Sequence, residues 1–184
     1  MKIISIPLAL LSLTISSIAQ DMKMIESEAL KKWPDKKEMQ EYVIKTEVEA
    51  FSKIEKFQTD KVVDRQSLKW LKEMAAEKWP KSYAMQEFLI KREIKAGHGL
   101  ANFKKPEGMT AAVFDGIFDG SVEKWEEWSM ILFRVEAQIK AWNELRELEM
   151  LNGAKGKAAV KEGEKKWRGD YTMQLYVAKK VLNK

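Results

Sequence analysis

The stretch WPKSYAMQEFLIKREIKA, from Trp79 to Ala96, decides the fold because the chain contains four versions of it. The other versions begin at Trp33, Trp125 and Trp167, and the last of them is shortened. Successive tryptophans lie 46, 46 and 42 positions apart. A near-constant period of this length is typical of helical repeat proteins. The sequence therefore predicts an all-α fold of four tandem helical hairpins with a period of about 46 residues.

The residues before each tryptophan predict the first helix of a hairpin. Counting back from the tryptophan, apolar or small residues fall at positions −11, −8 and −4, which places them on one face of a helix. Pro34 and Pro80 follow two of the tryptophans and cannot continue that helix. The residue at −4 is small in every copy, which leaves room for the indole and for another helix. These residues are Ala29, Ala75, Ser121 and Gly163.

The second helix of each hairpin carries two apolar stripes on opposite faces. One stripe combines a recurring methionine with an aromatic residue three positions later, and the other contains mostly aliphatic residues. A helix with two opposed stripes is expected to be sandwiched between its own partner helix and a neighbouring hairpin. The first stripe and the tryptophans are therefore expected to form the repeat core. This expected core comprises Trp33, Met39, Tyr42, Trp79, Met85, Phe88, Trp125, Met130, Phe133, Trp167, Met173 and Tyr176.

The predicted copies form a single domain, residues 20–184, packed as a short array or an irregular bundle. Their approximate ranges are 22–58, 64–97, 109–151 and 154–184.

Two glycine-containing segments interrupt the regular pattern. Gly97, His98 and Gly99 are expected to end the second helix of the second copy, with His98 in a loop. The segment Asn152–Gly163 is rich in Gly, Ala and Lys and is expected to be frayed or mobile.

Residues 1–19 have the pattern of a secretory signal peptide. Lys2 provides a positive start, an apolar run follows, and Ser17 and Ala19 are small residues at the positions that a signal peptidase reads. The alternative is a membrane anchor, but the run is short for a full span and contains polar residues. We expect cleavage after Ala19, export to the periplasm or beyond the cell, and no membrane span in the mature chain.

Little in the sequence indicates an enzyme or a cofactor site. The chain has no cysteine, which excludes disulfides and thiolate metal ligands, and its single histidine is His98. No serine-nucleophile elbow, phosphate-binding glycine loop or His-Glu-x-x-His zinc motif occurs. The methionines could suggest copper(I), but four of the ten recur with the predicted core, which favours packing. We expect no catalytic residues, no cofactor and no bound metal.

The repeat without a catalytic motif predicts an exported binding or scaffolding module for a protein or a cell-envelope polymer. Trp70 and Trp142 lie outside the repeating tryptophan column and are the candidate binding residues. The net charge of +5 supports an alternative function, in which basic helix faces bind an anionic membrane surface or a polyanion. Nucleic acid is an unlikely partner for an exported protein.

Overall fold

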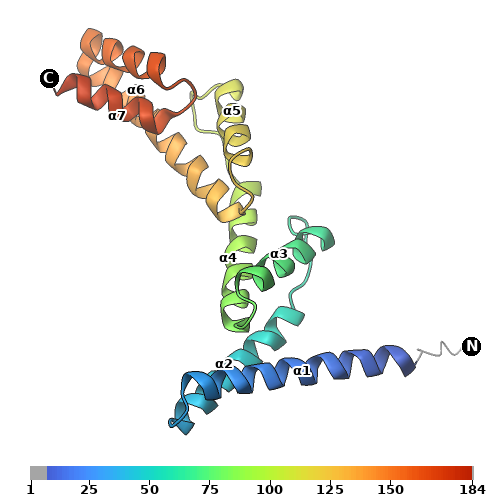
Figure 1. Ribbon diagram of the computed structural model, residues 1–184. Helices are drawn as coiled ribbons and strands as arrows, with labels where there is room; N and C mark the ends of the chain where they lie inside the picture. Colours follow the sequence, from blue (N-terminus) through green and yellow to red (C-terminus); the bar gives the residue numbers. More distant parts are fainter. Residues whose placement is uncertain (1–7, 184) are drawn as a thin grey trace, which may run out of the picture. The chain divides into compact units, whose positions relative to one another are not determined.

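The computed structural model describes residues 8–183, with side chains from residue 20 onward. Within this range the chain forms seven α-helices and no strand (Figure 1). The prediction of an all-α fold is confirmed. The helices are α1 (Leu8–Lys32), α2 (Lys37–Glu55), α3 (Arg65–Lys78), α4 (Tyr83–Ala101), α5 (Ala111–Val122), α6 (Trp128–Lys166) and α7 (Tyr171–Leu182).

Helix α1 overlaps the segment predicted to be a signal peptide. Residues 1–7 of that segment lie outside the described residues, and α1 continues without a break past the predicted cleavage position at Ala19. None of the helices that the structure describes combines the length and apolar character needed to cross a membrane. The absence of a span in this part of the chain agrees with the sequence prediction.

The described chain divides into two compact units, the first ending at Arg92 and the second beginning at Glu93. The boundary lies inside α4, so the first part of this helix belongs to one unit and its last part to the other. Each unit has its own set of buried side chains.

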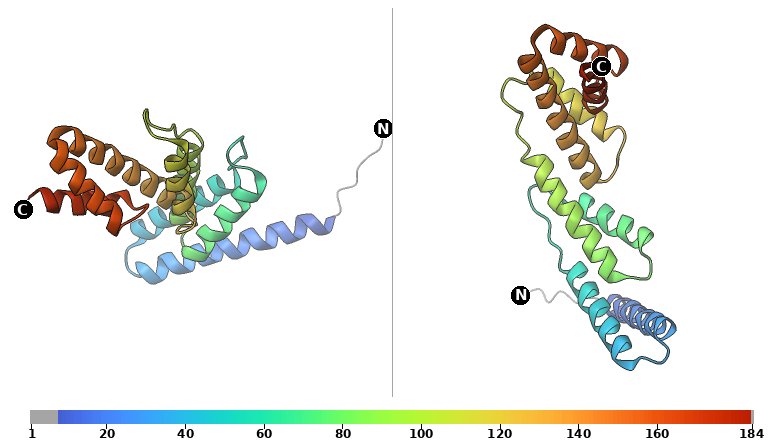
Figure 2. Two further views of the ribbon diagram at one scale, coloured as in Figure 1. Left: turned by 90° about the horizontal axis from the view of Figure 1, so that it is seen from above. Right: turned by 90° about the vertical axis from the view of Figure 1, so that its left-hand side faces the viewer.

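In the first unit, α1 pairs with α2 and α3 pairs with α4, each across a short turn (Figures 1 and 2). Ile25 and Ala29 of α1 are fully or almost fully buried, as are Leu71 and Ala75 of α3. These are the −8 and −4 positions before Trp33 and Trp79, so the one-sided pattern predicted for the first helices is present here. Asp64 caps α3 by accepting a hydrogen bond from the Ser67 N–H at 2.7 Å.

The second unit is built around a cluster of buried apolar side chains from α5, from α6 and from the segment just before α5. Phe103, Phe114 and Phe118 pack together against this cluster, with ring centroids 4.8 to 6.5 Å apart. Thr110 caps α5 by accepting a hydrogen bond from the Val113 N–H. The cluster comprises Met109, Ile117, Ile131, Val135 and Ile139.

Gly97 and Gly99 do not end a helix, contrary to the prediction, and α4 continues to Ala101 with His98 as a helical residue. A Cβ at Gly97 would lie 2.5 Å from the Trp128 ring, and a Cβ at Gly99 would lie 2.8 Å from a Leu132 methyl carbon. The two glycines therefore allow α6 to pack closely on α4. Close packing by α6 explains their presence better than helix termination does.

Helix α6 consists of two helical segments joined by a reversal at Gly153, which has φ 54° and ψ −126° (Figure 1). These angles lie in a region that strongly favours glycine. The prediction that Asn152–Gly163 is frayed was wrong, because this segment is helical after the reversal and buries Gly156, Ala159 and Gly163. A Cβ at Gly156 would lie 2.3 Å from the Leu148 carbonyl oxygen, so glycine lets the two segments touch.

The residue four positions before each tryptophan must be small because other parts of the chain pack closely against it. Ala29, Ala75 and Ser121 have no exposed surface. At the fourth such position, a Cβ on Gly163 would lie 2.6 Å from the Gln174 carbonyl oxygen of α7. The backbone of the second helix therefore passes directly over this residue.

Side chains on one helix bind the start of a later helix at three places. Glu47 of α2 accepts hydrogen bonds from the Ser82 hydroxyl and the Ala84 N–H, both at 2.9 Å. Glu93 of α4 accepts from the Ser129 N–H at 2.9 Å and the Ser129 hydroxyl at 2.6 Å.

The third connection of this kind uses an amide in place of a carboxylate. The side-chain oxygen of Gln138 accepts from the Tyr171 N–H at 2.6 Å. Glu47, Glu93 and Gln138 each lie eight positions after a methionine in the sequence. The same column therefore ties α2 to α4, α4 to α6, and α6 to α7.

Candidate binding surface

A glutamine side chain holds each of three tryptophan turns in place. Gln40, Gln86 and Gln174 donate through Nε2 to the backbone carbonyl oxygen of the tryptophan seven residues earlier, at 2.6 to 2.8 Å. Trp79 and Trp167 have nearly the same backbone angles, φ −133° and ψ 61° against φ −134° and ψ 61°. These glutamines therefore hydrogen-bond the turn backbone. The turns therefore present their tryptophans in a fixed way.

The tryptophans themselves are only partly covered. Trp79, Trp125 and Trp167 are 42 to 44% exposed, and Trp33 is half-buried. The expectation that all four lie in the repeat core is therefore not met.

The methionine and aromatic columns also differ from the expected core. The aromatic side chains three positions after the methionines are 59 to 67% exposed, Met39 and Met85 are exposed, and Met130 and Met173 are half-buried. The aliphatic stripe on the opposite face is the better buried one: Ile90, Val135 and Ala178 have no exposed surface. The second helices therefore bury one of their two stripes, and no further described helix layer covers the other. The exposed aromatic residues are Tyr42, Phe88, Phe133 and Tyr176.

A tryptophan and two members of the exposed stripe meet at one hollow in the second unit. Trp125, Met130 and Phe133 line a hollow of about 320 Å³. Arg134, Ala137, Gln138 and Thr172 complete its wall. Mainly apolar side chains with a few polar groups are the usual lining of a surface that receives a partner side chain.

A hydrogen-bond network around Asp170 supports the polar rim of this hollow. Asp170 Oδ1 accepts from the Thr172 hydroxyl at 2.6 Å and from Gln138 Nε2 at 3.0 Å. It also caps α7 by accepting from the Met173 N–H, and Arg134 lies 3.6 Å from its second oxygen. The network fixes the start of α7 beside the wall of the hollow.

The same network changes the acidity of Asp170. Burial alone would raise the pKa of this carboxyl group, but the hydrogen bonds it accepts and the positive charge of Arg134 outweigh burial and lower its pKa to about 2. Asp170 is therefore a carboxylate at any physiological pH.

Trp70 and Trp142, the predicted binding residues, are half-buried. Trp142 packs against the core cluster of the second unit, and the Arg146 guanidinium lies 4.8 Å from its ring centroid. Trp142 belongs to the same unit as the hollow at Trp125 but does not line it. The more exposed aromatic side chains are those that the sequence had placed in the core.

One signal in the sequence distinguishes the exposed stripe from the buried one. The exposed stripe contains methionine, tyrosine, phenylalanine and tryptophan, which are enriched at protein interfaces. The buried stripe contains mainly Ile, Val, Leu and Ala, as at Ile90 and Val135. Residue type, and not periodicity, carries this information, because both stripes repeat equally well.

No group of three or more His, Asp or Glu residues suited to holding a metal ion occurs within residues 8–183. No family model matches the sequence, and comparison with curated proteins and with solved structures likewise finds no match.

Proposed function

We propose that this chain is an exported, non-enzymatic helical-repeat protein that binds a protein partner through the exposed tryptophan, methionine and aromatic side chains of its hairpins. In this proposal four copies of one hairpin follow a signal peptide, residues 1–19, that is removed after Ala19. The glutamine clamp at three turns and the three connections by Glu47, Glu93 and Gln138 support common descent of the copies.

The exposure of the aromatic stripe is the observation that carries the proposal. Large apolar side chains that gather on a protein surface often mark an interaction site. Phe88 and Phe133 are more than half exposed, although each follows a methionine on the same helix face. Burying aromatic and methionine side chains against a partner would be strongly favourable.

The hollow at Trp125 suggests what the partner contributes. A volume of about 320 Å³ with an apolar floor suits one or two apolar side chains, such as those on one face of an amphipathic helix. Arg134 and Thr172 at its wall can bind polar groups beside those side chains. The proposed partner is therefore a protein segment with an apolar face.

The experiment compares two variants with the wild-type protein. Phe88→Ser combined with Phe133→Ser removes one exposed aromatic side chain of the proposed stripe from each unit. Met150→Ser combined with Leu151→Ser removes two exposed apolar side chains near the α6 reversal, outside that surface. A partner retained by the wild-type protein from its native envelope fraction is identified, purified and titrated against all three proteins.

We expect the Phe88 and Phe133 variant to bind this partner at least about 30-fold more weakly, since an interface aromatic typically contributes about 2 kcal/mol or more. The Met150 and Leu151 variant should bind like the wild type, and all three should melt at similar temperatures. Equal affinity of both variants would refute the proposed surface.

An anionic membrane surface or a polyanion is the second candidate partner. Lys45, Lys91 and Lys179 lie three positions after the exposed aromatic residues and are themselves exposed, which gives the apolar stripe a basic edge. Co-sedimentation with vesicles of anionic lipid, but not of neutral lipid, and release by salt would favour this alternative.

A further inference from the structure

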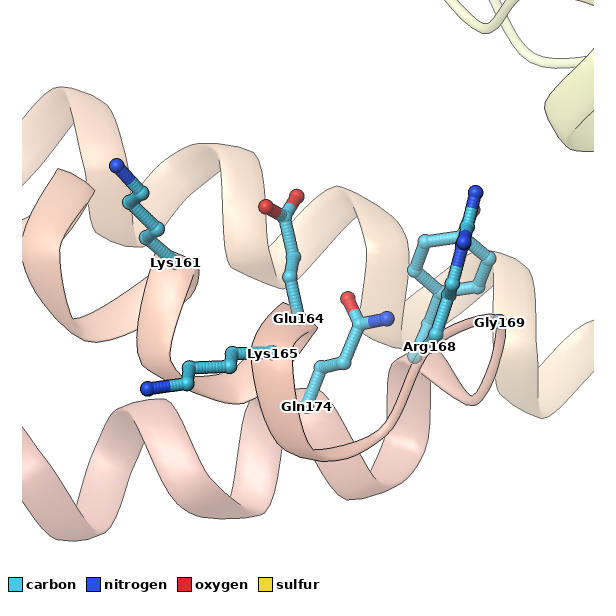
Figure 3. A pocket seen from close by; sticks show the side chains of 7 residues that line it. Lys161, Glu164, Lys165, Arg168, Gly169 and Gln174 are labelled. Carbon is cyan, nitrogen blue, oxygen red and sulfur yellow. The ribbon is translucent and has the colours of Figure 1, made fainter.

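A second hollow lies in the last hairpin, where the end of α6, the following turn and the start of α7 meet (Figure 3). Its volume is about 450 Å³, and most of the residues that line it are polar or charged, unlike those at the hollow beside Trp125. The residues that line it are Lys161, Glu164, Lys165, Arg168, Gly169, Tyr171 and Gln174.

The lining has an excess of positive charge. Lys161, Lys165 and Arg168 supply three cations, and Glu164 supplies one carboxylate. In the described part of the chain, none of these cations forms an ion pair with a carboxylate. The cations are therefore available to a ligand that carries negative charge.

Gln174 adds a hydrogen-bond acceptor to this pocket. Its side chain is 3% exposed, and its Nε2 donates to the Trp167 carbonyl oxygen at 2.8 Å. Its Oε1 is buried and has no hydrogen-bond partner among the described protein groups. In Figure 3 the amide of Gln174 lies between the Glu164 carboxylate and the Arg168 guanidinium.

The unsatisfied oxygen belongs to this hairpin in particular. Gln86 donates to the Trp79 carbonyl oxygen in the same way. The Gln86 Oε1, however, does not belong to the buried atoms that lack a hydrogen-bond partner. A buried carbonyl oxygen with no donor is unfavourable and is normally satisfied. A ligand at Gln174 therefore needs a hydrogen-bond donor as well as negative charge.

We infer that this pocket binds a hydroxylated anion of the uronic acid or sugar phosphate class. The carboxylate or phosphate group binds Lys161, Lys165 and Arg168, and a hydroxyl group donates to Gln174 Oε1. Glu164 accepts a hydrogen bond from a second hydroxyl group. This site is separate from the exposed aromatic stripe, and it does not depend on the proposed protein partner.

Titration of the purified protein with four compounds tests the ligand class. Glucuronate and glucose 6-phosphate carry both features, glucose carries only hydroxyl groups, and inorganic phosphate represents the bare anion. Saturable binding of glucuronate or glucose 6-phosphate, at least tenfold tighter than that of glucose or phosphate, is expected. Equal binding of inorganic phosphate, or no saturable binding of any compound, overturns the inference.

Charge variants test the location. Lys165→Gln with Arg168→Gln should reduce the affinity at least tenfold. Lys155→Gln with Lys157→Gln removes the same charge from exposed α6 positions outside the pocket and should leave the affinity unchanged. An equal loss in both double variants would indicate general charge attraction and contradict the assigned site.

A matched pair of glutamine variants tests the acceptor. Gln174→Met and Gln86→Met each remove one glutamine-to-tryptophan hydrogen bond, but only Gln174 lines the pocket. Only Gln174→Met should weaken glucuronate or glucose 6-phosphate binding, with both melting temperatures measured alongside. Unchanged binding by Gln174→Met, or an equal loss in Gln86→Met, overturns the role of the amide oxygen.

Discussion

Single polar side chains determine how the helices of this protein meet. Glu93 has no exposed surface, yet both of its oxygens are used by the N–H and hydroxyl groups of Ser129. A buried carboxylate is tolerated only with such partners. These contacts fix which residue of α4 lies against the start of α6, so they specify the helix register in addition to any stability they add.

Asp170 provides a pH-dependent test at this scale. Its pKa is lowered from 3.8 to about 2 in the folded protein, so its ionised form stabilises the fold. This stabilisation is fully present above pH 4 and is lost as the pH falls from about 4 to about 2. Relative to Asp170→Asn, the wild-type free energy of unfolding should therefore fall by about 2 kcal/mol between pH 5 and pH 2.

Denaturant unfolding of both proteins at several pH values measures this difference. The other carboxylates, such as Glu28 and Glu144, are present in both proteins and cancel in the comparison. A difference between wild type and variant that does not change with pH would show that the charge of Asp170 contributes nothing to stability.

The individual helices were the most predictable part of the structure. The spacing of small and apolar residues correctly predicted which face of α1 and of α3 is buried, including Ala29 and Ala75. The reversal at Gly153 was not predicted, because the glycine-rich stretch that contains it was interpreted as frayed. Gly156 and Gly163 of this stretch instead allow close packing of the backbone. Composition alone does not separate these cases: Gly116 has open space around it, whereas Gly156 touches backbone.

The close contact at Gly163 gives a prediction for this helix pair. Gly163→Ala places a Cβ 2.6 Å from the Gln174 carbonyl oxygen, so α6 and α7 must move apart. Overpacking of this kind typically costs about 1–3 kcal/mol, which corresponds to a melting temperature lower by roughly 2–12 °C.

Gly116→Ala is the matched control, because it is also helical and has nothing within 4 Å of the added carbon. It should leave the melting temperature unchanged or raise it slightly, since alanine favours helix more than glycine does. Thermal melts followed by circular dichroism compare the two. A Gly163→Ala protein as stable as the wild type would contradict the packing described for this turn.

At the scale of the whole molecule, the all-helical class followed from the period, but the location of the proposed binding surface did not. The sequence shows two apolar stripes on each second helix, and it does not show how many layers of helix are present to cover them. Each second helix has one stripe covered by helices of its own unit. Phe88 and Phe133 belong to the other stripe and remain exposed. Counting covering layers requires the tertiary structure, and this is why the candidate site was predicted as core.

The division into two compact units predicts that a change in one unit acts mainly within it. Val135→Ala removes two methyl groups from the core cluster of the second unit and should cost about 1–3 kcal/mol. Amide hydrogen exchange should become faster in α5 and in the first segment of α6, with α1 to α3 unchanged. Equal loss of protection throughout the described helices would instead indicate one cooperative unit.

The shared junction chemistry predicts that one segment of this chain can be removed while a joint of the same kind is kept. Glu47 and Glu93 bind the same kind of group, a serine at the start of a later helix. Deleting residues 48–93 would put Glu47 in the position of Glu93, opposite Ser129. The two carboxylate oxygens of Glu47 would then replace those of Glu93 as acceptors for the Ser129 N–H and hydroxyl groups. We expect the shortened chain to keep a carboxylate-to-serine joint between the parts that it retains.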